Sequence, residues 1–147
     1  MKIYHATEKN LEEVASWIDT KKECQIWGGP SVSYPIRLKA LIEEIGFSAD
    51  NSYVYKAKES VIAFGQVIKK TEGTNHLARI IISPNSRGKG YGFELCSALI
   101  SIAKESGDMI TLNVYRTNQK AVALYEKLGF IEDKVKSTNE SILMVKT

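Results

Sequence analysis

Apolar residues in the first third of the chain recur with a helical period. Leu11, Val14 and Ile18 are spaced for one helix face behind Thr7, a residue that suits an N-cap, so we expect a helix over residues 7–20. A second, short amphipathic helix is predicted from Ile36 to about Ile45. Between them, residues 21–35 ("KKECQIWGGPSVSYP") contain glycine and proline and are predicted to form a loop.

Elsewhere the pattern favours strands. "KIYHA" is a short first strand, and "SYVYKAK" and "SVIAFGQVIKK" are expected to form a hairpin that turns near Glu59–Ser60. "HLARIIISP" is an apolar strand that ends at Pro84, and "MITLNVY" is another. Helices are predicted over 88–104 and from about 117 to 129, followed by two closing strands. The order β-α-α-β-β-β-α-β-α-β-β predicts an α/β layered domain with one parallel crossover in an otherwise antiparallel sheet.

Composition narrows the class of protein. A chain of 147 residues with 44% apolar and 25% charged residues fits one soluble globular domain, residues 1–147. Cys24 and Cys96 form no CxxC or Cys/His cluster, so we expect free thiols in a reducing compartment and no metal. With no apolar leader or membrane-length segment, the prediction is a cytoplasmic protein without a membrane partner. A net charge of +3 from scattered lysines argues against nucleic acid as the partner.

The segment "IIISPNSRGKGYGFELCSALI" places three glycines, Gly88, Gly90 and Gly92, where a strand is followed by a helix. Glycine permits positive φ and close approach, and the first N–H groups of a helix have no internal acceptor. Such a turn binds pyrophosphate readily, and Arg87 and Lys89 add positive charge. Tight packing of helix on sheet explains the glycines equally well if the turn is taken alone. The spacing matches neither a P-loop nor the dinucleotide-binding G-x-G-x-x-G pattern.

The glycine turn and a second motif, taken together, resemble the two signatures of a known family. "SPNSRGKGYGFELCSALI" is similar to the Q/R-x-x-G-x-G/A acyl-coenzyme A motif of the GNAT acyltransferases, and "LNVYRTNQKAVALYEKLGF" resembles their second signature. The resemblance implies a single-domain GNAT-type fold, with a mixed, mostly antiparallel sheet of six to seven strands and helices on both faces. It also implies transfer of an acetyl (acyl) group from acetyl-CoA to an amine by direct attack on the thioester.

The resemblance assigns roles to particular positions. The strand residues would pair with the pantetheine arm, backbone amides of the turn would hold the pyrophosphate, and two asparagines would contact the coenzyme. These cofactor-binding positions are Ile80, Ile81, Ile82, Arg87, Gly88, Lys89, Gly90, Tyr91, Gly92, Asn113 and Asn118. Asn118 also suits a helix cap, and the two roles are compatible.

Tyr125 would lie near the thioester sulfur. A phenol has an ordinary pKa of about 10, so it is protonated at neutral pH and can donate to a leaving thiolate as general acid. Considered without the motif, Tyr125 is a core aromatic that shares a helix face with Ala121, Leu124 and Leu128.

A general base is harder to find. Many family members carry a glutamate on the strand before the turn, whereas "HLARIIISP" has no carboxylate. His76, whose imidazole has an ordinary pKa near 6.5, is the candidate catalytic base, with Glu72, Glu94 or water as weaker alternatives. Arg79 stands where an acid might be expected. It either pairs with a carboxylate of the acceptor or extends from the sheet edge.

The acceptor is expected to bind near the first helices and their loop, which makes Trp27 and Tyr34 candidate substrate-binding residues. Arg79, on the strand before the glycine turn, is the third candidate. Trp27 fits core packing equally well. The acceptor is a small-molecule amine or an amine of a peptide or protein. A non-catalytic acyl-CoA-binding sensor is the alternative function, and both monomer and homodimer are compatible with the sequence.

Overall fold

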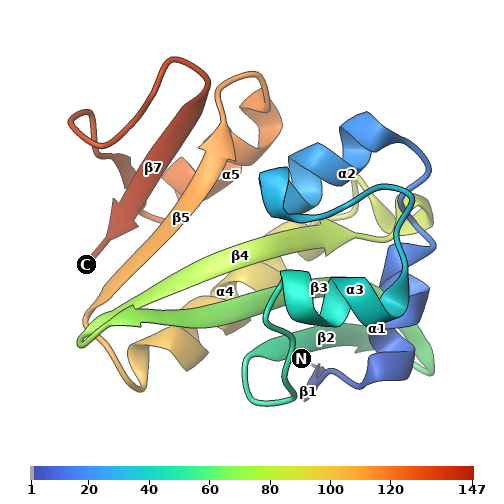
Figure 1. The fold of residues 1–147 in the computed structure, drawn as a ribbon. Coiled ribbons are helices and arrows are strands. Elements are labelled where there is room, and N and C mark those ends of the chain that lie inside the picture. The colour runs from blue at the N-terminus through green and yellow to red at the C-terminus, as the bar shows by residue number, and fades with distance from the viewer. Residues whose placement is uncertain (1) are drawn as a thin grey trace. The chain divides into compact units, whose positions relative to one another are not determined.

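The computed structural model describes residues 2–147, which form seven strands and five α-helices (Figure 1). The hydrogen-bonded strand order is β1-β2-β3-β4-β5-β7-β6. The pair β4–β5 is parallel, whereas β1–β2, β2–β3, β5–β7 and β6–β7 are antiparallel. The predicted mixed, mostly antiparallel α/β fold is confirmed. The strands are β1 (Ile3–His5), β2 (Ser52–Ala57), β3 (Ser60–Thr71), β4 (Thr74–Ile82), β5 (Met109–Tyr115), β6 (Ile131–Glu132) and β7 (Ser141–Lys146).

The helices are α1 (Glu8–Ala15), α2 (Lys21–Gly28), α3 (Leu38–Glu44), α4 (Tyr91–Lys104) and α5 (Gln119–Lys127). Two short 3-10 turns cover Gly29–Ser31 and Pro84–Ser86. The chain divides into two compact units: residues up to Gln66 with Arg79–Leu95, and Val67–Ala78 with Cys96–Thr147. Strands β3 and β4 and helix α4 each contribute residues to both units. The prediction of a single domain over 1–147 stays a prediction.

The first unit contains helices α1, α2 and α3 around an apolar core. Leu11, Val14, Leu41 and Phe64 are inaccessible to solvent, and each belongs to one cluster of buried side chains. Thr7 caps α1 as predicted, since its side chain accepts from the N–H of Asn10. Burial of these faces against one another provides the main stabilisation of the unit.

Helix α2 corrects the prediction that residues 21–35 form a loop. Thr20 accepts a hydrogen bond from the N–H of Glu23, and the Glu23 carboxylate accepts one from the N–H of Thr20. This reciprocal cap satisfies two N–H groups at the start of the helix. Cys24 and Trp27, three residues apart, are both buried and therefore lie on the inward face.

Helix α4 begins at Tyr91, three residues later than predicted. Gly88 and Gly90 have φ values of 77° and 85°, which the α-helical conformation excludes. The glycine turn is therefore a non-helical connection between the 3-10 turn and the helix, and the N–H groups of residues 87–90 make no helical hydrogen bond.

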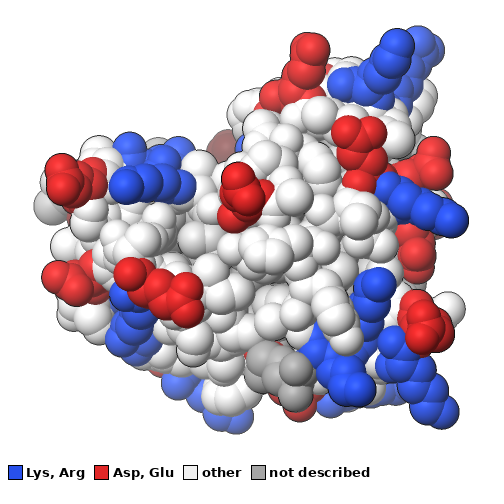
Figure 2. Space-filling view, turned by 90° about the horizontal axis from the view of Figure 1, so that it is seen from below, with Lys and Arg blue, Asp and Glu red and all other residues white. Residues whose placement is uncertain are grey.

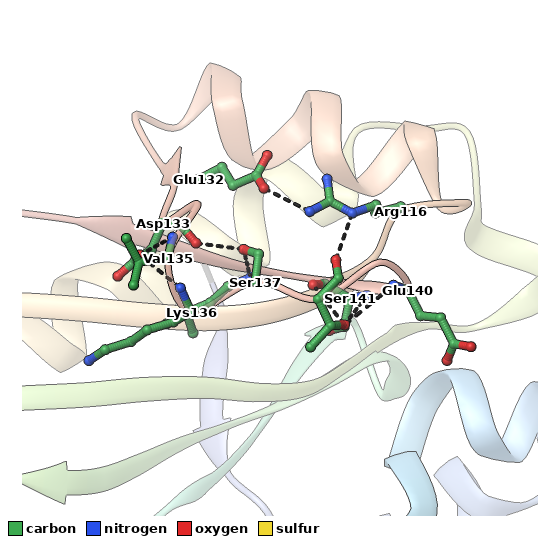
Figure 3. Close-up of polar contacts among 10 residues, drawn as sticks. Arg116, Glu132, Asp133, Val135, Lys136, Ser137, Glu140 and Ser141 are labelled. Carbon is green, nitrogen blue, oxygen red and sulfur yellow. Dashed lines mark hydrogen bonds and ion pairs between the residues drawn. The ribbon is translucent and has the colours of Figure 1, made fainter.

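The second unit is built on β5, which pairs with β7 along its full length from Ile110–Lys146 to Tyr115–Ser141. Asn118 caps α5, and Gly129, with φ of 99°, follows its last turn as predicted. Arg116, which follows β5, donates to the Glu132 carboxylate at 2.8 Å and to the Thr138 carbonyl at 2.9 Å (Figure 3). These two bonds connect the end of β5 to the last residue of β6 and to the loop before β7.

Candidate active site

The glycine turn exposes the backbone of residues 87–90. An added Cβ at Gly88 or Gly90 would meet no atom within 4 Å, so open space lies over both residues. Among residues 2–147, no acceptor receives a hydrogen bond from the N–H groups of 87–92. Unpaired amides in a row, with the partial positive charge of a helix N-terminus, are suited to the oxygens of a pyrophosphate.

The end of β4 leads directly into this turn. Ile80, Ile81 and Ile82 are each half-buried, and Ile81 packs on the core of the first unit. The N–H of Ser83 donates to the Ile62 carbonyl at 2.8 Å, which fixes the strand end to β3. The Arg87 side chain folds back, because its Nε donates to the Ile82 carbonyl at 3.1 Å.

Tyr91 and Glu94, in the first turn of α4, contact β2. The ring of Tyr91 lies 5.8 Å from that of Tyr55, centroid to centroid, and the Tyr55 hydroxyl donates to the Glu94 carboxylate at 3.0 Å. Burial and this carboxylate raise the pKa of Tyr55. Glu94 is therefore already paired with a phenol.

The candidate acceptor-binding residues lie in the first unit, where two of them contact each other and the third lies apart. Trp27 is buried against Phe64, with ring centroids 6.2 Å apart, and its indole N–H donates to the Arg79 carbonyl at 2.9 Å. Arg79 donates from Nη1 to the Gln66 side-chain oxygen at 3.0 Å. Tyr34 is partly exposed, and its hydroxyl donates to the Asp19 carbonyl at 2.6 Å. Trp27 and Arg79 therefore contact each other directly, while Tyr34 bonds to the segment before α2.

In the second unit, α5 places Tyr125 in an apolar environment. The side chain is 8% exposed, and its ring meets the edge of Phe130 at a centroid distance of 6.0 Å. Burial, and to a lesser degree the Cys96 thiol, raises the pKa of Tyr125 well above 10. Its hydroxyl makes no hydrogen bond to any residue in the described part of the chain. The hydroxyl is therefore free to bond with a ligand.

His76 is also buried, at 9% exposure, and lies between two side chains of β5. Its Nδ1 is 2.7 Å from the Thr111 hydroxyl oxygen, and its Nε2 is 3.5 Å from the Asn113 amide nitrogen. With an amide donor facing Nε2, the ring proton of the neutral histidine belongs on Nδ1 and is donated to Thr111. Asn113 is exposed beside it, and Asn118 accepts from the N–H of Ala121 at 3.4 Å as the cap of α5.

Three of the contacting residues carry no recognisable signal in the sequence. Gln66, Cys96 and Thr111 lie 13, 29 and 35 positions from their partners Arg79, Tyr125 and His76. Gln66 and Thr111 belong to no motif, and Cys96 lies in the glycine-turn segment without an assigned role. The register of β4 against β5 brings Thr111 opposite His76, and only that pairing makes the contact apparent.

On the face shown in Figure 2, side chains of both signs are interspersed and form no continuous basic patch. No cluster of three or more His, Cys, Asp or Glu side chains suited to a metal ion occurs among residues 2–147. No helix between residues 2 and 147 is both long and apolar enough to cross a bilayer.

Solved structures share this fold. The PaiA N-acetyltransferase of Thermoplasma acidophilum, in complex with coenzyme A, superimposes with a TM-score of 0.76 at 20% identity, covering 99% of this chain and 98% of that one. The spermidine N-acetyltransferase of Vibrio cholerae, in complex with CoA and spermine, gives a TM-score of 0.75 at 21% identity, covering 98% and 93%. At these identities the likeness establishes the fold.

Sequence comparison covers shorter segments. An uncharacterized N-acetyltransferase of Bacillus subtilis, YobR, is 38% identical over 74 residues, which are 50% of this chain and 30% of the relative. The chain thus matches less than a third of that relative's length. The model of the Acetyltransferase (GNAT) family matches residues 12–130, from α1 through the glycine turn and α5. That span includes both motifs and most of the chain, and the protein therefore belongs to the GNAT acetyltransferase family.

Proposed function

We propose that the protein transfers an acetyl group from acetyl-CoA to the nitrogen of an amine acceptor, by direct attack of the amine on the thioester. The observation that carries this proposal is the row of unpaired amides at residues 87–92, with open space over Gly88 and Gly90. Family membership supports the same chemistry, because the family match includes this turn.

The proposed coenzyme contacts in the first unit are the glycine turn and the end of β4. The amides of Arg87, Gly88, Lys89, Gly90, Tyr91 and Gly92 would bind the pyrophosphate, and Ile80, Ile81 and Ile82 would offer backbone groups to the pantetheine arm. The Lys89 side chain is exposed at the turn and adds positive charge. Asn113 and Asn118, exposed on the second unit, are the further proposed coenzyme contacts.

Tyr125 is the proposed general acid. Its raised pKa keeps the phenol protonated at every pH at which the protein would work. The hydroxyl has no competing partner among the described residues, so its proton is available to the departing thiolate. Core packing accounts for the ring, through its contact with Phe130, and leaves the hydroxyl free for the proposed role.

His76 is the proposed general base. Both of its ring nitrogens already face protein groups, Thr111 and Asn113. Glu94 accepts from Tyr55, and Glu72 is exposed in the β3–β4 connection. Water is the remaining candidate to receive the proton of the amine.

For the acceptor, the proposal is a small-molecule amine or an amine of a peptide or protein, bound near Trp27 and Tyr34. Proteins of the same fold include a spermidine N-acetyltransferase and a ribosomal-protein-S18-alanine N-acetyltransferase, so the fold is compatible with both. We propose a cytoplasmic monomer or homodimer. The alternative, a sensor that binds acyl-CoA without turnover, is favoured by the absence of a carboxylate on β4.

The proposal is tested by Gly90→Ala, with Gly46→Ala as the matched control. Both glycines have positive φ, 85° and 58°, and open space where a Cβ would be added, so both substitutions impose similar backbone strain. Calorimetry with acetyl-CoA should show binding weakened at least about 10-fold by Gly90→Ala and little changed by Gly46→Ala. Equal effects would contradict the assignment of the turn. Binding without thiol release across an amine panel would favour the sensor.

A further inference from the structure

Arg79 in β4 has a backbone conformation that is uncommon for a residue with a side chain. Its φ is 52°, a positive value that among the described non-glycine residues only Lys58 shares. The indole N–H of Trp27 donates to the Arg79 carbonyl at 2.9 Å and so holds this peptide from helix α2. This contact holds the backbone of Arg79 against helix α2, which lies in the segment expected from the sequence to bind the acceptor.

Within residues 2–147 the guanidinium has one hydrogen-bond partner, and that partner is neutral. Nη1 donates to the Gln66 side-chain oxygen at 3.0 Å. Gln66 is fully buried, and its amide nitrogen donates to the Ile45 carbonyl and the Ser52 hydroxyl, each at 3.1 Å. Because these bonds consume the nitrogen, the amide oxygen must face Arg79. Gln66 is therefore a positioning residue for the guanidinium.

No carboxylate of the described residues pairs with Arg79. Its Nε is shielded from solvent and has no partner in the described part of the chain. The side chain is half-buried, and this burial lowers the pKa of Arg79 below its ordinary value, although an arginine remains charged in proteins. Among residues 2–147, only one of its five N–H donors has a protein acceptor. A partly desolvated cation is unfavourable unless an anion pairs with it.

A purely structural arginine would be expected to use more of these donors. Partly buried guanidinium groups are normally satisfied by a carboxylate or by several carbonyls. The planar fork also matches a carboxylate through two parallel hydrogen bonds. The unsatisfied charge at Arg79 therefore indicates a ligand that brings its own anion.

We infer that the amine acceptor carries a carboxylate that binds to Arg79, so that the substrate is an amino acid or a short peptide. This inference rests on the proposed function. Arg79 directly precedes Ile80–Ile82, the residues proposed to lie along the acetyl-bearing arm. At about 3.3 Å per strand residue, these positions extend roughly 3–10 Å from Arg79, which is the amine-to-carboxylate separation of amino acids and short peptides. A polycation such as spermidine would be disfavoured by the same charge.

The experiment compares acceptors that differ only in the anion. The pairs are glycine and glycinamide, L-alanine and L-alaninamide, and 4-aminobutanoate and 4-aminobutanamide, with spermidine as the cationic acceptor. The measured quantity is kcat/KM from thiol release, with the acetylated product verified by mass spectrometry. Each pair is measured for the wild type, Arg79→Gln, Arg79→Lys and, as a charge-matched control, Lys70→Gln, which removes an exposed cation of β3.

The wild type should favour at least one carboxylate over its carboxamide by about 10-fold or more. Arg79→Gln should reduce the carboxylate-to-carboxamide ratio of kcat/KM to within about threefold of unity. The paired amines differ in basicity, but this difference is the same for both enzymes and cancels when the variant's ratio is compared with that of the wild type. Arg79→Lys, which keeps the charge but loses the fork, should give an intermediate ratio, and Lys70→Gln should keep it. The KM for acetyl-CoA should not change in Arg79→Gln.

Three outcomes overturn the inference. The first is a wild type that acetylates amines without preferring any carboxylate, a result that needs no variant to fold. The second is an unchanged ratio in folded Arg79→Gln. The third is a raised KM for acetyl-CoA with the ratio unchanged, which would assign Arg79 to the coenzyme. Failure of the wild type to consume acetyl-CoA with any acceptor would instead refute the proposed function, and the inference with it.

Discussion

Replacement of Tyr125 by Phe separates catalysis from packing. The side chain is 8% exposed and its ring packs on Phe130, a contact that phenylalanine keeps. Since the hydroxyl donates to no residue of the described chain, its removal breaks no protein hydrogen bond. The free energy of unfolding should therefore change by less than about 0.5 kcal/mol.

The effect on catalysis should be much larger. A positioned general acid contributes about 100- to 10,000-fold, and a leaving thiol with an ordinary pKa near 8.5 needs less assistance than an alcohol would. We therefore expect kcat to fall by about 100-fold in Tyr125→Phe, or about 2.7 kcal/mol of transition-state stabilisation. Because burial raises the pKa of Tyr125, the wild type should lose no activity through its ionisation until well above pH 10.

The matched control is Tyr53→Phe. Tyr53 is equally buried, at 8% exposure, but its hydroxyl donates to the Asp50 carbonyl at 3.2 Å. Its removal should cost about 1 kcal/mol of stability and leave kcat unchanged. Urea denaturation and steady-state thiol release measure the two quantities. An undiminished kcat in folded Tyr125→Phe between about pH 6 and pH 10 would refute the general-acid role.

Two further predictions concern stability. Thr20→Ala removes the cap that begins α2 and should cost about 1 kcal/mol in urea denaturation; an unchanged free energy of unfolding would show that the cap does not stabilise the helix. The hydrogen bond from Arg116 lowers the pKa of Glu132 below 4.5, so its stabilising contribution is present above that pH and is lost as pH falls through the lowered value. Thermal denaturation of Glu132→Gln should accordingly show a reduced midpoint at pH 7 and a difference that disappears in acid, whereas a pH-independent difference would contradict this account.

Local signals in the sequence located much of the fold correctly. Thr7 before a helical apolar period predicted α1, and "LYEKLGF" predicted the end of α5 at Gly129, because caps and periodicity depend on neighbouring residues alone. The same reasoning should have found α2, whose Thr20–Glu23 cap and Cys24–Trp27 spacing are visible in the sequence. The glycines and prolines that follow it drew the prediction toward a loop.

The sequence by itself determined the family, the glycine turn and the candidate acid, since each depends on residues close together in the chain. Only the tertiary structure decided what those residues contact. The pairing of Arg79 with Gln66 and Trp27, and of His76 with Thr111, joins positions 13, 52 and 35 residues apart. Side-chain partners of this kind follow from strand register and helix packing, which no local pattern specifies. The physical reason is that an unpaired charge or hydroxyl becomes apparent only when every possible partner has a position in space.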